Sequence, residues 1–145
     1  MFKRTAFIGL TLLCISSTVT AGSLLVEVFH GAEQRVINIK DAQRVATVAV
    51  YDLSQPEQIE DRISAHLSND PLLAQRQAKR ILEANGQNIM REFAAAYQGT
   101  LKAKEYQLTK LPAIVFNHGQ SVVYGELNLA KAIYRYRESL ARSKK

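Results

Sequence analysis

The sequence predicts a mixed α/β sandwich, and three observations support this prediction. Two short apolar segments, 24–29 and 46–53, are typical of strands. A long stretch of helical periodicity, 54–106, separates them from a second pair of strand candidates joined by a turn, 113–124. Because strands separated by helices favour parallel pairing and a hairpin adds antiparallel pairing, the predicted sheet is mixed.

The two predicted N-terminal strands differ in their apolar content. Leu24–Phe29 (LLVEVF) is rich in apolar and β-branched residues, and His30–Glu33 (HGAE) ends it. Ala46–Leu53 (ATVAVYDL) is apolar almost throughout, which is typical of a strand covered on both faces. Between them, Arg35–Ile39 alternates polar and apolar residues and predicts either a short extra strand or an irregular loop.

Helix signals begin directly after the second strand. Ser54–Glu57 (SQPE) has the pattern of a capping box, in which the serine and glutamate side chains satisfy backbone N–H groups. Asp70 followed by Pro71 predicts the N-cap and the first position of another helix. The first helix has an apolar face formed by Ile59, Ile63 and Leu67.

The second helix is predicted to be long. Its apolar residues at helical spacing are Ala78, Leu82, Ile89, Phe93 and Tyr97. Asn85–Gly86 interrupts the pattern and marks either a kink or a break between two helices. We predict one helix with a weak point there, ending between Gln98 and Tyr106.

The last third of the chain predicts a hairpin and a final helix. Ala113–Phe116 is a strand, Asn117–Gly119 (NHG) is a turn, and Gln120–Tyr124 is the antiparallel return strand. Asn128 is placed to cap the helix that follows. The apolar face of this helix consists of Leu129, Ala132, Ile133, Tyr136 and Leu140.

The N-terminus has the pattern of a secretory signal peptide. Lys3 and Arg4 are followed by a ten-residue apolar run, Ala6–Ile15, and then by small residues ending at Ala21. Ten residues are too few for a transmembrane helix, which needs about 20. We therefore expect cleavage after Ala21, export to the periplasm, and a single mature domain spanning 22–145 with no transmembrane segment.

The sequence lacks the patterns expected of an enzyme. Cys14 is the only cysteine and lies in the predicted signal peptide, so the mature domain has no thiol for redox chemistry or metal binding. His30, His66 and His118 lie far apart and lack metal-ligand spacing. No nucleophile elbow, Walker loop or dinucleotide fingerprint occurs. We expect no catalytic residue, no metal, no cofactor and no enzymatic activity.

The predicted domain is basic. Without Lys3 and Arg4 the chain has 17 basic and 13 acidic residues, a formal charge of +4. Much of the excess lies at the C-terminus, in Arg135, Arg137, Arg142, Lys144 and Lys145. Such an end either meets nucleic acid or an anionic surface, or is a solvated helix end whose charges suit the helix dipole. Because helical spacing places Tyr136 in the buried face, stacking of Tyr134–Arg137 on DNA is the less expected alternative.

Tyr106–Gly125 resembles the second half of the thioredoxin fold. In that fold a proline, usually in a cis peptide bond, precedes the third strand, and Leu111-Pro112-Ala113 has that position here. The resemblance implies a thioredoxin-like three-layer sandwich with a mixed central sheet and helices on both faces. This chain departs from the pattern after its first strand, where His30–Glu33 stands without the Cys-x-x-Cys motif.

A closer resemblance is to a family of exported proteins encoded in integrating conjugative elements, which carry a domain of unknown function. It rests on Ala96–Gly99 (AYQG), Lys110–Ala113 (KLPA) and Val122–Gly125 (VVYG). These proteins are similar to type-F conjugative pilus assembly proteins with a thioredoxin-like fold. The resemblance implies a noncatalytic periplasmic accessory of a conjugative type IV secretion apparatus for DNA transfer, acting through protein–protein contacts.

The predicted partner-binding residues are Leu111, Pro112, Ala113, His30 and Tyr124. Backbone beside such a proline can pair with an extended peptide from another protein of the apparatus or from an exported polypeptide. The alternative is that Pro112 only shapes the turn into its strand. Two other functions stay open, namely an exported folding factor or isomerase-like enzyme, and an accessory that contacts DNA.

Overall fold

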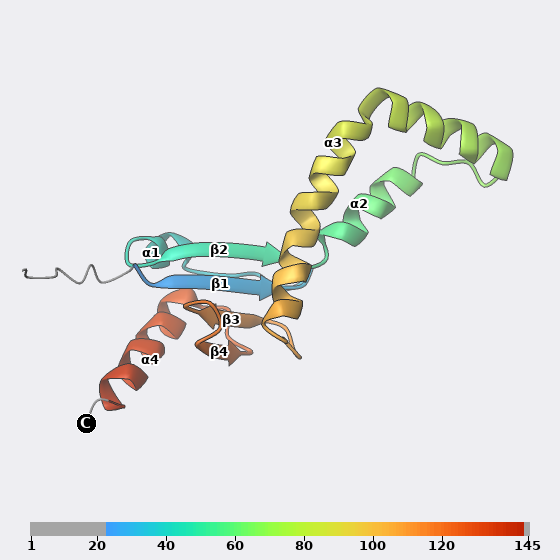
Figure 1. Ribbon diagram of the computed structural model, residues 1–145. Helices are drawn as coiled ribbons and strands as arrows, with labels where there is room; N and C mark the ends of the chain where they lie inside the picture. Colours follow the sequence, from blue (N-terminus) through green and yellow to red (C-terminus); the bar gives the residue numbers. More distant parts are fainter. Residues whose placement is uncertain (1–22, 144–145) are drawn as a thin grey trace, which may run out of the picture.

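The computed structural model describes residues 23–143. The predicted signal peptide, its cleavage point after Ala21, and the last two lysines lie outside these residues. The elements, in chain order, are β1 (Leu25–His30), α1 (Ile39–Gln43), β2 (Thr47–Asp52), α2 (Gln55–Ser64), α3 (Pro71–Glu105), β3 (Ala113–Phe116), β4 (Ser121–Tyr124) and α4 (Leu129–Arg142) (Figure 1).

The four strands form one mixed sheet in the order β2-β1-β3-β4. β1 and β2 are parallel, whereas β3 is antiparallel to both β1 and β4. Side chains alternate between the two faces of the sheet. α1 and α4 cover one face, and the C-terminal part of α3 covers the other. The prediction of a mixed α/β fold is therefore confirmed.

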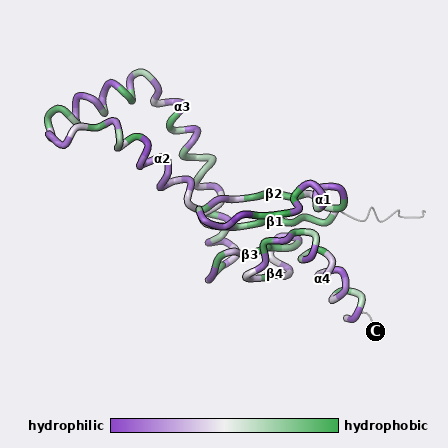
Figure 2. The backbone as a smooth tube through the Cα atoms, turned by 180° about the vertical axis from the view of Figure 1, so that it is seen from behind, coloured by the Kyte–Doolittle hydropathy of each residue, from purple (hydrophilic) through white to green (hydrophobic). Residues whose placement is uncertain are grey.

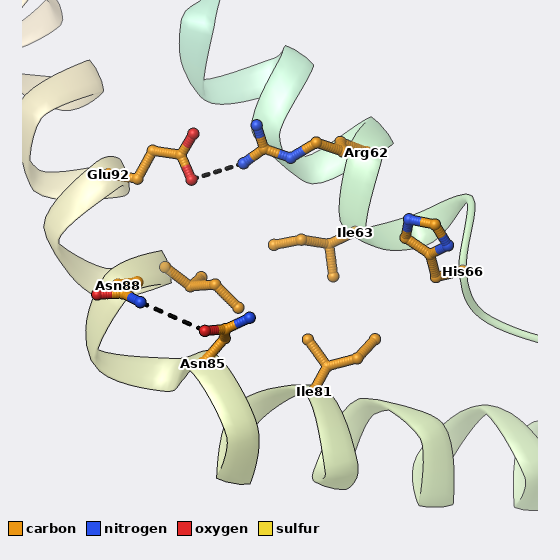
Figure 3. A pocket seen from close by; sticks show the side chains of 8 residues that line it. Arg62, Ile63, His66, Ile81, Asn85, Asn88 and Glu92 are labelled. Carbon is orange, nitrogen blue, oxygen red and sulfur yellow. Dashed lines mark hydrogen bonds and ion pairs between the residues drawn. The ribbon is translucent and has the colours of Figure 1, made fainter.

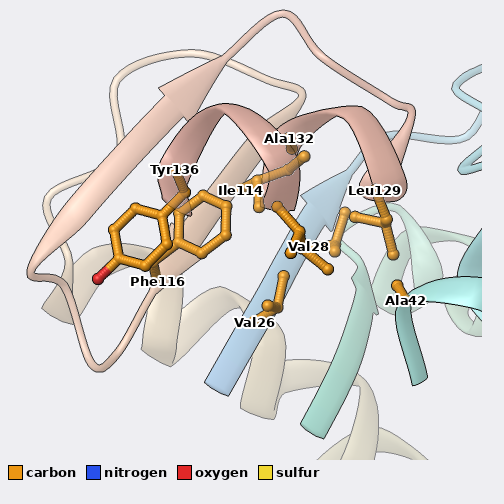
Figure 4. Close-up of a cluster of buried hydrophobic side chains, with 9 residues drawn as sticks. Val26, Val28, Ala42, Ile114, Phe116, Leu129, Ala132 and Tyr136 are labelled. Carbon is orange, nitrogen blue, oxygen red and sulfur yellow. The ribbon is translucent and has the colours of Figure 1, made fainter. Parts of the chain in front are cut away.

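The larger core lies between the sheet and α1 and α4 (Figure 4). Phe116 and Tyr136 stack almost parallel, with ring centroids 4.3 Å apart. The Tyr136 hydroxyl accepts a hydrogen bond from Asn117 Nδ2 at 3.1 Å, so its polar atom is satisfied. The buried members of this cluster are Val26, Val28, Ala42, Ile114, Phe116, Leu129, Ala132, Ile133 and Tyr136.

The second core lies under α3 and depends on small residues. Ala96, Gly99 and Ala103 are the buried residues of α3. A Cβ atom built on Gly99 would lie 2.8 Å from Tyr51 Cβ, so only glycine allows this approach of α3 to β2. Packing thus explains the small residues of the AYQG segment, since its first and last residues are buried at the contact between helix and sheet.

α2 and the N-terminal part of α3 pack against each other and project beyond the end of the sheet (Figure 1). We call this pair, residues 55–95, the arm. No residue from 60 to 95 is buried. The arm mixes hydrophilic and hydrophobic positions, whereas β1 and β2 are mostly hydrophobic (Figure 2).

α3 is continuous over 35 residues, as predicted, and changes direction near Asn85–Gly86 (Figure 3). Its start is also as predicted, since Asp70 accepts hydrogen bonds from the Leu72 and Leu73 N–H groups. Likewise, Asn128 caps α4 by accepting from Lys131 N–H. Side-chain acceptors of this kind can be recognised from local sequence because their partners lie two or three residues away.

Three local predictions for the part of the chain before α3 are wrong. Ser54 makes no capping bond to a backbone N–H, because its hydroxyl donates to Asp52 and accepts from Gln58 instead. Leu67 lies beyond the end of α2. No residue of β2 is buried, because β2 is an edge strand and pairs only with β1.

The segment left open as a strand or a loop forms a single bridge, Ile37 to Asn128. The short helix α1, which begins at Ile39, the last residue of that segment, was not predicted. Its N-cap Asn38 has φ 62° and makes no side-chain capping bond, so the usual start signal is missing.

Candidate partner-binding site

The sheet brings the five predicted residues to one of its ends. In the strand register Phe29 lies opposite Ala113, and Ala113 lies opposite Tyr124. His30 is the next residue along β1, and Leu111 and Pro112 lead directly into β3. Residues from three different segments of the chain therefore meet at the C-terminal end of β1.

The five residues nevertheless divide between the two faces of the sheet. Ala113 belongs to the cluster on the α3 side, and Tyr124, its cross-strand partner, lies on the same face. His30 follows Phe29, which is on the α3 side, so its side chain lies on the opposite face. A partner that contacts His30 and Tyr124 together must therefore reach around the end of the sheet.

Exposure separates the residues that can touch a partner from those that support them. Leu111 and Tyr124 are 40% and 42% exposed. Pro112 and Ala113 are buried. The Leu111–Pro112 peptide bond is cis, and the Pro112 carbonyl accepts a hydrogen bond from Gly125 N–H at 2.9 Å. Leu111 and Tyr124 thus form the accessible part of the site.

His30 is half-buried and hydrogen-bonded to its own loop. Its Nδ1 lies 2.9 Å from the Gly31 carbonyl oxygen, which can only accept, so Nδ1 carries the proton. Asp52 is the cross-strand neighbour of His30. Burial raises the pKa of Asp52, but hydrogen bonds from Ser54 and the charge of His30 outweigh burial and leave this pKa below 3.8.

A buried acidic residue that was not predicted as special lies in the middle of β1. Glu27 is 2% exposed and is the one polar residue in the buried part of residues 23–143. It accepts hydrogen bonds from Lys102 Nζ at 2.6 Å and from the Tyr106 hydroxyl at 2.5 Å. Both partners lie at the C-terminal end of α3, so the cluster fastens this end of the helix to the sheet.

The charges of this cluster depend on one another. Burial raises the pKa of Glu27, but the hydrogen bonds from Lys102 and Tyr106 and the charge of Lys102 outweigh it, so the pKa lies below 4.5. The hydrogen bond to Glu27 raises the pKa of Lys102 above 10.5. Both groups are therefore charged at neutral pH and form an ion pair.

Glu27→Gln is expected to lower the free energy of unfolding by about 2 kcal/mol at neutral pH, because two hydrogen bonds to a charged acceptor are weakened. The unfolded state takes up the Glu27 proton near pH 4.5, whereas the folded state takes it up at lower pH. Stability from Glu27 is thus present above pH 4.5 and is lost as the pH falls below it.

Urea denaturation of both proteins over a pH series measures this effect. The difference between the wild type and Glu27→Gln should shrink at acidic pH. Glu83→Gln is the control, because Glu83 pairs with Lys79 at 3.8 Å on the surface and is expected to contribute under about 0.5 kcal/mol. A difference for Glu27→Gln that does not change with pH would contradict the assignment.

A hollow lies in the arm, between α2 and α3 (Figure 3). Its volume is about 440 Å³, and isoleucines from α2 and from both limbs of α3 line it. Arg62 and Glu92 close one side with an ion pair of 2.6 Å. Its residues are Arg62, Ile63, His66, Ile81, Asn85, Asn88, Ile89 and Glu92.

Within residues 23–143, no group of three histidine, cysteine, aspartate or glutamate side chains is arranged to hold a metal ion. In the same part of the chain, no helix has both the length and the apolar character needed to span a bilayer.

The fold and the site define a small mixed α/β protein with a four-stranded sheet and a projecting helical arm. A family model matches residues 26–141, and the chain belongs to this family, DUF1525, described as a protein of unknown function. A comparison with curated proteins finds no match, and a comparison with solved structures finds none either.

Proposed function

We propose that this protein is a noncatalytic periplasmic accessory of a conjugative type IV secretion apparatus encoded by an integrating conjugative element. It acts by binding other proteins of that apparatus through the sheet end. The proposal rests on the resemblance carried by the KLPA and VVYG segments. It is supported by the position of these segments, because Leu111 and Tyr124, one from each, are both exposed at the same end of the β3–β4 hairpin.

The proposed scaffold is thioredoxin-like. Support comes from the cis peptide bond before Pro112, the antiparallel β3–β4 hairpin after it, and the final helix that packs on the sheet. The redox motif of that fold has no counterpart, since His30–Glu33 follows β1. Residues 23–143 contain no cysteine, and a scaffold of this type without that chemistry retains its surface for binding.

The mode of binding that we propose is the addition of an extended segment of the partner beside Leu111. Within residues 23–143, neither the Leu111 N–H nor its carbonyl takes part in a backbone hydrogen bond. Such free groups can pair with an incoming strand, while the side chains beside them give specificity. The exposed Leu111 and Tyr124 side chains are the apolar contacts available there.

The double variant Leu111→Asp/Tyr124→Asp is expected to weaken partner binding about tenfold or more, since each change places a charge where an apolar contact is buried. DNA transfer between cells and co-purification from the envelope of conjugating cells measure the effect. Tyr134→Asp is the matched control, because Tyr134 is 68% exposed on α4, away from this end of the sheet.

Two outcomes would overturn the proposal. If deletion of the gene leaves DNA transfer unchanged, the role in conjugation is wrong. If the double variant folds and both transfers DNA and co-purifies like the wild type, the sheet end is not the binding site. Equal loss in the double variant and in Tyr134→Asp would also remove the site, because it would show a general effect of surface charge.

A further inference from the structure

α3 carries an apolar stripe on its outer side, formed by Met90, Ala94, Tyr97 and Leu101. We call it the α3 stripe. Met90 and Leu101 are each 66% exposed, Tyr97 is 42% exposed, and Ala94 is exposed. Large apolar side chains exposed in a row on one helix face are typical of an interaction surface.

The α3 stripe lies opposite the face that binds the sheet. At 3.6 residues per turn, its four residues fall on one side of the helix, and the buried Ala96, Gly99 and Ala103 fall on the other. All four lie after the bend near Asn85–Gly86, in one limb of α3. The protein's own sheet therefore does not obstruct a partner that approaches this side. α2 reaches the stripe at Tyr97, whose hydroxyl donates a hydrogen bond to Glu60 at 3.4 Å.

The spacing within the stripe is that of a coiled-coil seam. Successive residues are four, three and four positions apart, which is the alternation of the two core positions in a heptad. The stripe covers about three turns of the helix, or roughly 16 Å. A second α-helix is thus the structure that fits it.

We propose that the partner helix is α3 of a second copy of this chain, packed antiparallel about a twofold axis between Ala94 and Tyr97. In this arrangement Ala94 of each copy faces Tyr97 of the other, and Met90 faces Leu101. The large Tyr97 thereby meets the small Ala94, the similarly sized Met90 and Leu101 meet each other, and the seam is filled evenly. Parallel packing would place Tyr97 against Tyr97 and leave a gap between two alanines.

One charge in line with the stripe favours the same direction. Lys104 is the next core position of the same heptad, and in the antiparallel dimer it is level with the neutral Gln87 of the other copy. In a parallel dimer Lys104 would face its own copy across the seam, and the two like charges would repel. The stripe is therefore complementary to itself in one orientation, as a twofold interface requires. This inference does not depend on the proposed function.

Sedimentation equilibrium over a concentration series tests the dimer. The protein is expressed from the full sequence, including its N-terminal segment, and then purified. The wild type is expected to dimerise, and Met90→Glu and Leu101→Glu are expected to dissociate about tenfold or more readily. Leu82→Glu is the control, because Leu82 is 57% exposed on the same helix but lies before the bend and off the stripe. Circular dichroism checks that each variant stays folded.

Cysteine cross-linking tests the orientation in a Cys14→Ser background, which leaves no native cysteine. An equimolar mixture of Ala94→Cys and Tyr97→Cys chains should form disulfide dimers that contain one of each, because facing residues lie within disulfide reach. Ala94→Cys chains that cross-link chiefly with themselves would overturn the antiparallel arrangement. A monomeric wild type at every concentration, or equal dissociation by Leu82→Glu, would overturn the interface.

Discussion

Phe116→Ala is expected to lower the free energy of unfolding by about 4 kcal/mol. Phe116 is 0% exposed at the end of β3, and its ring stacks on Tyr136 of α4. The change removes buried apolar surface and leaves a cavity that sheet and helix cannot close, because both are held by their other contacts. It also removes the ring against which Tyr136 of α4 packs.

Urea denaturation followed by far-UV circular dichroism measures this loss. Phe93→Ala is the matched control, since Phe93 is only half-buried and stacks on Tyr97 at a centroid distance of 6.1 Å in a thinly packed part of the molecule. We expect this control to cost about 1 kcal/mol. Equal losses in the two variants would mean that the cluster beneath α4 is not the main core.

Gly99→Ala is expected to lower the free energy of unfolding by about 2 kcal/mol, although alanine is the better helix former by about 1 kcal/mol. The added methyl group would lie 2.8 Å from Tyr51 Cβ and 3.1 Å from a Leu53 methyl carbon. Tyr51 Cβ is attached directly to the β2 backbone, so relief requires α3 to move away from the sheet. This movement would also strain the nearby contact of Lys102 with Glu27.

Gly86→Ala provides the control within the same helix. A Cβ atom there would meet nothing closer than Leu82 Cβ at 4.0 Å, so the gain in helix propensity is not opposed by a clash. We expect Gly86→Ala to stabilise the protein by about 0.5–1 kcal/mol. Thermal or urea denaturation should thus give shifts of opposite sign for the two glycines, and shifts of the same sign would contradict the close contact of α3 with β2.

Local patterns in the sequence predicted most of the fold. Period-two and period-3.6 apolar patterns located all four strands and the three longer helices, with ends within a few residues for most of them. The buried face of α4 was predicted correctly from Leu129 to Tyr136, while the prediction that Leu140 belongs to it is wrong, since Leu140 is 44% exposed. α1 escaped prediction because five residues give no periodicity and Asn38 supplies no capping bond.

The site was predictable only in part, because its geometry depends on contacts far apart in the sequence. Proximity of Leu111 and Tyr124 follows from the hairpin, but the division of His30 and Tyr124 between opposite faces depends on the register of β1 with β3. The Glu27–Lys102 pair joins residues 75 positions apart. Its one local sign was a glutamate in the apolar segment LLVEVF, which indicates that a buried charge needs a partner.

The length by which the arm projects beyond the sheet can change without a change in the rest of the fold. Since no residue from 60 to 95 is buried, adding or removing whole turns at the tip would leave the buried clusters on both faces of the sheet unchanged. Each residue added to a helix lengthens it by about 1.5 Å, so a change of one turn in both helices moves the tip by roughly 5 Å. The length of the arm can therefore change without altering the two buried clusters that hold the sheet.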